Sequence, residues 1–355
     1  MTDRGGEPLR KSFRVTLADV ARKASVSSAT ASQVLNNRPN CWASLETRGR
    51  ILTAARELGY RPNLTARSLR EGRTQSIGTV SPLFYAGTHH NRSTGIFEAA
   101  RQRQYAVIYS VHGNLADQEE NLIQLHLDKG IDGLILQPSD GGTHEELKRL
   151  VNIGFPVVTL DGSCAFSFDC DDVSADYTEA GRLQAAHLLA LGRKRIVLAN
   201  TVPTVYMHAV REDAVRQELE KEGLPPPLLM DIGIGADGEP PTQVQLESAM
   251  RTFLIQNKGQ FDGLLGDDNA ASLAIRLLLE MGLKVPEDVA VIGSGDTQLA
   301  QFGVVPLTSV NVNDLWIGEQ AFKMLLSRIE NPPRHTFRHL VSAPSLTIRA
   351  SSVRS

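Results

Sequence analysis

The chain has 355 residues, with 37 Lys and Arg against 40 Asp and Glu, so its formal net charge is only −3. This length allows two or three domains with buried cores. The sequence has no apolar run long enough to span a membrane and no secretory signal at its start, so we expect a cytoplasmic protein without membrane contact. Its three cysteines form no Cys-x-x-Cys pair, which favours reduced thiols over a disulfide.

The charge is unevenly distributed along the chain. Residues 1–76 hold 14 basic and 6 acidic residues, a net charge of +8, whereas the remainder holds 23 basic and 34 acidic residues, a net charge of −11. A basic segment releases counterions from nucleic-acid phosphates, while an acidic body disfavours general adhesion to them. The pattern favours a nucleic-acid-binding head on a body with another task.

Residues 1–14 are rich in Gly, Pro and basic side chains, which predicts a disordered tail. Residues 15–62 predict three short helices, because apolar residues recur there at helical spacing between capping and breaking residues. The limits of these helices are marked by Thr16 with Asp19 three positions on, by a turn at 25–27, by Ser44 and by Gly59.

The second helix keeps one polar face once its apolar residues pack against the other two helices. A helix that enters the major groove needs short side chains for close approach, and hydroxyls or amides to read base edges. The alternative is the solvated face of an ordinary three-helix domain, but the basic charge of this region favours DNA reading. The residues concerned are Ser27, Ser28, Ala29, Thr30, Ser32, Gln33 and Asn36.

Three runs of this region, residues 15–21 (VTLADVA), 26–36 (VSSATASQVLN) and 59–69 (GYRPNLTARSL), resemble the lactose-repressor (LacI/GalR) family of bacterial transcription regulators. The resemblance implies a helix-turn-helix domain followed by a hinge helix and linker over 63–75. This hinge helix would fold on DNA, pair with its twin in a dimer and insert Leu69 into the minor groove. Packing of Leu69 at the domain junction is the alternative. Further implied DNA contacts are Thr16, Leu17, Tyr60, Asn63, Ala66, Arg67 and Arg70.

The head departs from the family pattern in two places. Gln33 stands where an arginine is common, which implies a different base preference. The segment 40–43 lengthens the loop before the third helix, and its Trp42 either stacks over the head core or faces the DNA backbone.

After residue 76, short apolar runs alternate with helical stretches. Such alternation predicts an α/β protein of parallel sheets with helices on both faces, and the series is long enough for two sheets. The expected strands are 77–80, 106–111, 133–136, 157–160, 196–198, 263–265 and 289–292. The expected helices are 92–104, 117–129, 145–153, 179–191, 212–222, 245–257, 270–281 and 317–330.

The resemblance extends through this body, for example at residues 130–135, 283–293 and 346–351. It implies a two-lobed core like that of periplasmic binding proteins, with a small-molecule effector between the lobes. The implied effector-binding and dimerisation core is 76–351, with a first lobe of 76–176 and 312–332, a second lobe of 177–311 and 333–351, and crossings near Asp176 and Asn311.

Polar side chains follow several of the expected strands, and ligands of open α/β sheets bind at these carboxyl ends. In sugar-responsive members of the family, the positions of Asp161, of Arg211 at the start of a helix and of Asp267 bind ligand hydroxyls, which suits carboxylate and guanidinium groups. A structural ion pair or strand-end cap is the alternative for these residues. Gly295 stands where the family often has a ligand-binding aspartate. The expected effector-binding residues are Tyr85, His89, Asp161, Arg211, Asp267 and Asp296.

The sequence contains no catalytic motif and predicts no cofactor or metal. The nucleophile-elbow, phosphate-loop and zinc-protease motifs are missing, and Gln298 stands where a dinucleotide fingerprint needs its third glycine. The His89-His90 pair lacks further metal ligands at a suitable spacing. The acidic segment 169–172 lacks the calcium-loop pattern and is predicted to be a solvated loop.

The sequence therefore predicts an effector-controlled transcription regulator, with a repressor as the first choice and a sugar or sugar derivative as the default effector. We expect a homodimer on a near-palindromic DNA operator, because two heads must meet two half-sites and the chain carries no leucine-heptad tail. Induction and corepression would use the same parts. A solute-binding module and a sugar-processing α/β enzyme are the alternative functions.

Overall fold

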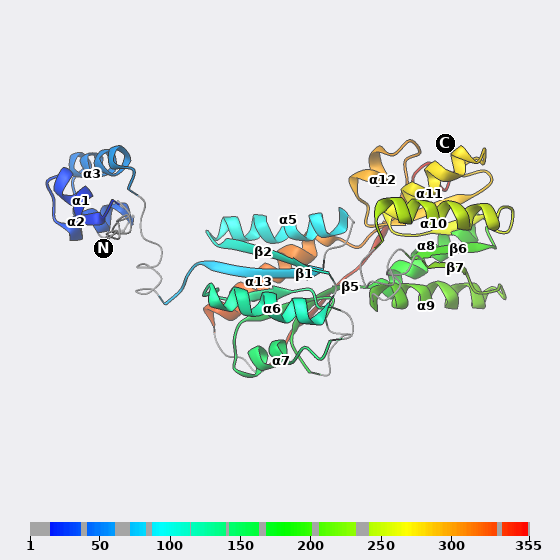
Figure 1. Ribbon diagram of the computed structural model, residues 1–355, viewed down its shortest axis with the longest axis horizontal. Coiled ribbons are helices and arrows are strands. Elements are labelled where there is room, and N and C mark those ends of the chain that lie inside the picture. Colours follow the sequence, from blue (N-terminus) through cyan, green and yellow to red (C-terminus); the bar gives the residue numbers. More distant parts are fainter. Residues whose placement is uncertain are drawn as a thin grey trace, which may run out of the picture. The chain divides into compact units, whose positions relative to one another are not determined.

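The computed structural model describes residues 15–36, 41–60, 72–82, 87–113, 115–139, 142–162, 168–200, 206–231, 241–331 and 336–353. The chain separates into two compact units, residues 1–74 and residues 75–355, drawn as ribbons in Figure 1. We call the described part of the first unit the head and that of the second unit the core. Within these ranges, no helix combines the length and the apolar character needed to cross a bilayer.

The head consists of the three predicted helices, α1 (Leu17–Lys23), α2 (Ser28–Leu35) and α3 (Leu45–Leu58). Thr16 and Asp19 form a full capping box at α1. The Ser44 hydroxyl accepts a hydrogen bond from an amide of the first turn of α3 at 3.2 Å, and Gly59 ends this helix with φ +64°. The apolar faces of the three helices meet in one cluster, whose centre contains Val20, Ala31 and Ile51.

Two six-stranded sheets form the core. The first has the order β11-β5-β4-β3-β1-β2, with all neighbouring strands parallel. Its strands are β1 (Ser76–Pro82), β2 (Ala106–His112), β3 (Leu134–Leu136), β4 (Val157–Leu160), β5 (Asp171–Ala175) and β11 (His339–Ser342). The second has the order β12-β10-β9-β8-β6-β7, in which β12 is antiparallel to β10 and the other pairs are parallel. Its strands are β6 (Ile196–Asn200), β7 (Leu228–Asp231), β8 (Gly263–Leu265), β9 (Ala290–Ser294), β10 (Thr308–Asn311) and β12 (Ser345–Thr347).

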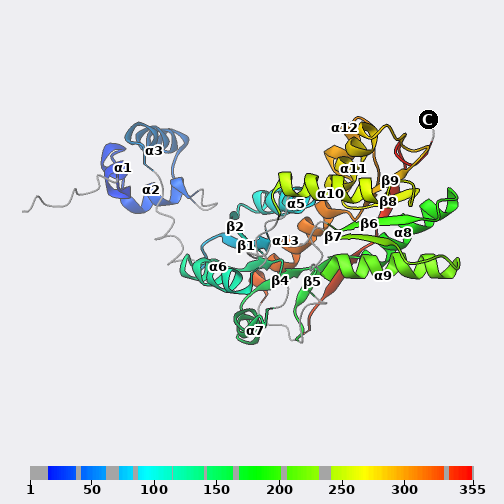
Figure 2. The same cartoon turned by 45° about the vertical axis from the view of Figure 1, so that its right-hand side comes forward.

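Helices cover both faces of each sheet, so each lobe has two apolar layers (Figures 1 and 2). On the first sheet, one face carries α5 (Gly87–Gln102) and α13 (Asp314–Glu330), and the other carries α6 (Ala116–Asp128) and α7 (Glu145–Asn152). On the second sheet, one face carries α8 (Tyr177–Ala190) and α9 (Tyr206–Lys221), and the other carries α10 (Gln243–Gln256), α11 (Asp268–Glu280) and α12 (Gln298–Phe302).

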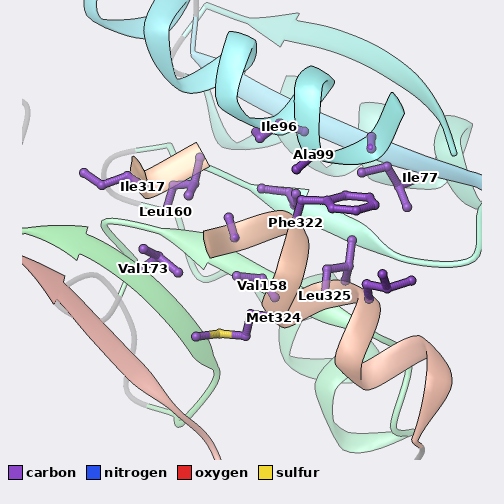
Figure 3. Close-up of a cluster of buried hydrophobic side chains, with 14 of the residues drawn as sticks. Ile77, Ile96, Ala99, Val158, Leu160, Val173, Ile317, Phe322, Met324 and Leu325 are labelled. Carbon is purple, nitrogen blue, oxygen red and sulfur yellow. The ribbon is translucent and has the colours of Figure 1, made fainter. Parts of the chain in front are cut away.

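Helix α13 lies between α5 and the first sheet. Phe322 of α13 is 1% exposed and packs among Ile96 of α5 and Val158 of β4 (Figure 3). The two helix backbones touch, because a Cβ on Gly318 would overlap the Arg92 carbonyl oxygen and lie 2.9 Å from its carbon. This close crossing brings Arg92 of α5 next to Asp314 in the first turn of α13.

The chain crosses between the sheets three times, after β5, after β10 and between β11 and β12. The first two crossings agree with those expected near Asp176 and Asn311. The expected assignment of 333–351 to the second lobe is wrong for β11, which extends the first sheet beside β5. A short and half-exposed edge strand carries too few buried residues to show a clear sequence pattern.

The solvated loop expected at 169–172 is wrong for Asp171 and Asp172, which are 1% and 0% exposed in strand β5. Burial is tolerated because both carboxylates are hydrogen-bonded. Asp171 accepts from Arg328 Nε at 2.6 Å, and Asp172 accepts from Thr159 Oγ1 at 2.7 Å. The strand is therefore stabilised by partners distant in sequence, which a local reading of three acidic residues does not show.

Candidate DNA-binding surface and effector site

Helix α2 presents the expected polar face. Ser27 caps the helix, accepting a hydrogen bond from the Thr30 amide at 3.1 Å. Its C-terminal end is held by Asn36, whose amide donates to the Ser32 carbonyl at 2.7 Å. The side chains of Ser27 and Asn36 therefore also hold the two ends of the helix. Ser28, Ala29 and Gln33 are the exposed residues of this face that take no part in capping.

The other expected DNA contacts divide into two groups. Thr16 is exposed in its capping box, while Leu17 and Tyr60 are partly buried against the head core, so they also stabilise the domain. The residues expected in the hinge lie outside the described residues: Asn63, Ala66, Arg67, Leu69 and Arg70. Trp42 is 97% exposed, so of the two placements considered for it, stacking over the head core is wrong.

In the core, Asp161 follows β4 as expected and lies in a buried polar cluster. Its carboxylate pairs with the guanidinium of Arg92 on α5, and it accepts hydrogen bonds from Tyr177 Oη at 3.0 Å and from the Ala175 amide at 3.1 Å. Arg92 also donates from Nε to Asp314 on α13 at 2.5 Å and from Nη2 to the Tyr177 hydroxyl at 2.8 Å. We call Arg92, Asp161, Tyr177 and Asp314 the crossing cluster, because Tyr177 and Asp314 begin the helices that follow the first two crossings.

Burial and charge act in opposite directions within the crossing cluster. Burial alone lowers the pKa of Arg92, but the carboxylates of Asp161 and Asp314 outweigh it and keep the pKa well above its usual value. Burial raises the pKa of Asp314 although it is paired, and burial also raises the pKa of Tyr177 well above its usual value. The guanidinium therefore remains charged and Tyr177 remains a neutral hydrogen-bond donor.

A second cluster lies on the other lobe, where Arg211 on α9 is 5% exposed. Burial lowers the pKa of Arg211, and the charge of Asp267 opposes that effect. Burial, together with the Arg211 charge, lowers the pKa of the neighbouring His208 to about 3, so its imidazole is neutral at physiological pH. Tyr177 also acts to raise the pKa of Arg211, so the two clusters lie near each other.

Two of the expected effector residues have local structural roles as well. Asp267 caps α11, accepting from the amides of Asn269 and Ala270 at 2.9 Å each. Asp296 accepts from Arg349 Nη2 at 2.6 Å, and its φ of +47° is a conformation that few residues other than Gly adopt. The expected start of a helix at Arg211 is wrong, since α9 begins at Tyr206.

The remaining expected effector residues are not placed. Tyr85 lies outside the described residues, and His89 belongs to α5 but its side chain is not described. Sequence reasoning missed Arg92, Tyr177, His208 and Asp314. The only local signal for Arg92 was its place on an expected helix, three positions before Gly95, which packs against α13. Among the described residues, no group of three or more His, Cys, Asp or Glu is arranged to hold a metal ion.

The fold and these two sites define a class of protein, a DNA-binding regulator in which a helix-turn-helix head is joined to a two-lobed ligand-binding core. Residues 16–63 match the family model of bacterial regulatory proteins of the lacI family, and residues 185–352 match that of a periplasmic binding protein-like domain. Catabolite control protein A of Priestia megaterium is 32% identical over 318 residues, covering 88% of this chain and 92% of that protein. The chain belongs to the LacI family of bacterial regulatory proteins.

Further comparisons agree with this family. The HTH-type transcriptional repressor PurR of Haemophilus influenzae is 29% identical over 343 residues, covering 95% of this chain and 98% of that protein. The lac repressor dimer bound to operator and the anti-inducer ONPF has the same fold, with a TM-score of 0.78 at 22% identity over 96% of this chain and 99% of that one. The regulator CelR in complex with cellobiose gives a TM-score of 0.67 at 25% identity, over 96% of this chain and 100% of that one. These relatives are transcription regulators and not enzymes.

Proposed function

We propose that the protein is a repressor that binds a near-palindromic operator as a homodimer, and that a carbohydrate effector bound between its lobes changes its operator affinity. The observation that carries this proposal is the exposed face of α2, presented by a capped and packed three-helix head. Its small side chains allow the helix backbone to approach base edges closely. Because its partner is chromosomal DNA, the protein acts in the cytoplasm.

Direct reading of bases is assigned to Ser28, Ala29 and Gln33, which are exposed on α2. Gln33 carries an amide, which suits paired donation and acceptance at an adenine. The hinge over 63–75 remains part of the proposal, with Leu69 as the minor-groove wedge. Replacing Leu69 with Ala should weaken specific operator binding and leave effector binding intact, whereas unchanged operator affinity at fixed salt would contradict the wedge.

The effector site is assigned to Arg211, Asp267 and Asp161, with Tyr85, His89 and Asp296 as further candidates. Buried guanidinium and carboxylate groups offer several fixed donors and acceptors to hydroxyl groups. CelR was solved with cellobiose, and a LacI-family regulator of Enterococcus faecium was solved with ribose, which supports a carbohydrate. With Gly295 in place of a carboxylate, the site has one polar contact fewer than the family pattern, so its sugar should differ from those of members with the full pattern.

Homodimerisation is supported by exposed apolar side chains in both lobes. Phe97 of α5 and Tyr109 of the edge strand β2 are 41% and 38% exposed and pack edge to face, with ring centroids 6.1 Å apart. In the second lobe, Phe302, the last residue of α12, and Val304 after it are 79% and 93% exposed. Apolar patches on soluble proteins mark interfaces, so a second copy of the chain is the proposed partner of these side chains.

Effector binding is coupled to the head through the lobes. The crossing cluster joins Asp161, at the carboxyl end of β4, to the helices that follow two of the three crossings. An effector that contacts Asp161 therefore acts on the connection between the lobes, and any change in their angle changes the spacing of the two hinges in a dimer. By thermodynamic linkage, the factor by which the effector changes the affinity for operator equals the factor by which operator changes the affinity for effector.

The function is tested with the full-length protein. Selection from random duplex DNA should yield a preferred sequence with two related half-sites. A thermal-shift panel of sugars, sugar acids, nucleosides and purines should yield a ligand that raises the melting temperature by mass action. That ligand should then change operator affinity. A protein that selects no sequence above background, or whose ligand leaves operator affinity unchanged, would overturn the proposal.

Two variants on the same helix locate the effector site. Arg211→Ala should abolish the thermal shift and the response to effector while keeping operator binding. Arg216→Ala is the matched control, because Arg216 is 46% exposed on α9 and pairs with Glu212 at the surface. A response retained by the Arg211 variant, or lost equally in both variants, would move the site elsewhere.

A further inference from the structure

Trp42 is the most exposed large apolar side chain of the protein among the described residues, at 97%. It follows α2 and lies just before α3, in the loop that is longer than the family pattern. Burial of an aromatic ring is strongly favourable, and Trp is found at interfaces where one side of the ring is apolar and its N–H meets a polar partner. A fully exposed indole beside the recognition helix therefore needs an explanation in terms of a partner.

The exposure of Trp42 follows from how its neighbours are held. Cys41, which precedes Trp42 in the chain, is 9% exposed in the head core. Ala43, which follows Trp42, packs against the same core. Arg48 of α3 donates from Nη2 to the Cys41 carbonyl at 3.0 Å and from Nε to the Ala43 carbonyl at 3.2 Å. The two residues flanking Trp42 are thus anchored inward, and one guanidinium fixes the backbone on both sides of it. The indole is held outward by this arrangement.

The place of Trp42 in the head suggests what covers it. Helix α2 has eight residues, so it is about 12 Å long, which is about the width of the major groove of B-DNA. When α2 lies in the major groove, the parts of the head that flank it face the phosphates of the groove walls. Helix α3 begins there as well, with its cap at Ser44, and first-turn amides carry a partial positive charge.

We propose that Trp42 contacts the DNA backbone at the edge of each half-site, with its ring packed on a deoxyribose and its indole N–H donating to a phosphate oxygen. The proposal rests on the proposed operator binding. Duplex DNA fits as the partner because this part of the chain carries a net charge of +8 over residues 1–76, and because a sugar-phosphate chain alternates apolar sugar edges with acceptor oxygens. Trp42 thereby adds affinity and positions α2, without reading sequence.

The first test compares binding of the full-length wild type, Trp42→Ala and Trp42→Phe to the selected operator and to an unrelated duplex. Trp42→Ala should weaken both by about tenfold, since backbone contacts carry no sequence information. The salt dependence should keep its slope, because no charge is removed. Trp42→Phe keeps a ring and loses the donor, so its affinity should lie between the two. Leu52→Ala is the matched control, because Leu52 is 50% exposed on α3, and it should bind as the wild type does.

Each outcome bears on the inference separately from the function. If the wild type selects no operator, the proposed function fails. If the wild type binds and Trp42→Ala binds within twofold of it, only the inference fails. A change in the selected sequence, instead of a uniform loss, would place the ring against bases and overturn the backbone contact.

A second measurement uses the small number of tryptophans. The chain has two, and Trp316→Phe leaves Trp42 as the sole indole. Acrylamide should quench Trp42 strongly in the free protein and weakly at saturating operator. Quenching that stays unchanged on DNA, or Trp42 already protected in the free dimer, would overturn the proposal.

Discussion

Replacing Arg92 with Met would test how strongly the crossing cluster holds the two lobes together. Met has a similar reach and no charge, so the carboxylates of Asp161 and Asp314, whose side chains are 7% and 2% exposed, would lose their cation. Removing one partner of a buried ion pair costs about 3–5 kcal/mol, because the other charge stays buried. Two carboxylates share this guanidinium, so we expect the free energy of unfolding of the core to fall by about 5 kcal/mol.

The pH dependence identifies the cause of this loss. Burial already raises the pKa of Asp314 in the folded wild type, and without the cation this pKa rises further. The loss of unfolding free energy caused by Arg92→Met is then largest above the raised pKa. It shrinks as pH falls through that pKa, because a neutral carboxyl needs no counter-charge. The difference in unfolding free energy between the wild type and Arg92→Met should therefore decrease from pH 7 towards pH 4.

Urea unfolding followed by Trp316 fluorescence measures this difference, since Trp316 packs against the first-lobe core. A Trp42→Phe background removes the signal of the head. Arg182→Met is the control, because Arg182 pairs with Glu179 at the surface of α8, and its effect should be much smaller. A difference below about 1 kcal/mol at pH 7, or one that does not change with pH, would refute the role of Arg92 as a buried counter-ion.

Two further predictions concern stability. Gly318→Ala would force α5 and α13 apart at the Arg92 carbonyl, so the free energy of unfolding of the core should fall by about 3 kcal/mol. Gly49 of α3 has open space around it, so Gly49→Ala should raise the free energy of unfolding of the head by about 0.5–1 kcal/mol. Urea unfolding of the two variants checks the opposite signs. In the folded protein the pKa of His208 is lowered to about 3 from 6.5. As pH falls, His208 is therefore protonated in the unfolded chain before it is protonated in the folded one. The free energy of unfolding of the core should thus decrease below pH 6.5, by about 2 kcal/mol at pH 5. His208→Gln should remove that part of the pH dependence, and an unchanged slope would exclude His208 as its source.

The head shows how far local sequence patterns reach. The caps at Thr16 and Ser44 and the ending at Gly59 were predicted and are confirmed, because a cap needs only residues three or four positions apart. Trp42 shows the limit of this reasoning. Its outward placement depends on Arg48 and on the burial of Cys41, which become neighbours of the loop only after the three helices have packed.

The core shows the same division. The strands with continuous apolar runs, such as β4, were predicted, since a strand buried on both faces must be apolar along its length. Strand β5 was missed because its buried carboxylates are stabilised by Arg328 and Thr159, which are not its neighbours in sequence. Asp161 was predicted as a ligand contact with a structural ion pair as the alternative, and the structure shows that ion pair, with Arg92.

The sequence by itself determined the elements whose signals are local, namely the capped helices of the head, the buried parallel strands and the alternation that makes two sheets. Tertiary structure alone decided where buried charges find partners and where exposed apolar residues lie. The physical reason is that a charge is tolerated inside a protein only with a partner, and Arg92 and Asp314 are separated by 222 positions in the chain. Helix packing across Gly318 joins them, and that contact has no local signature.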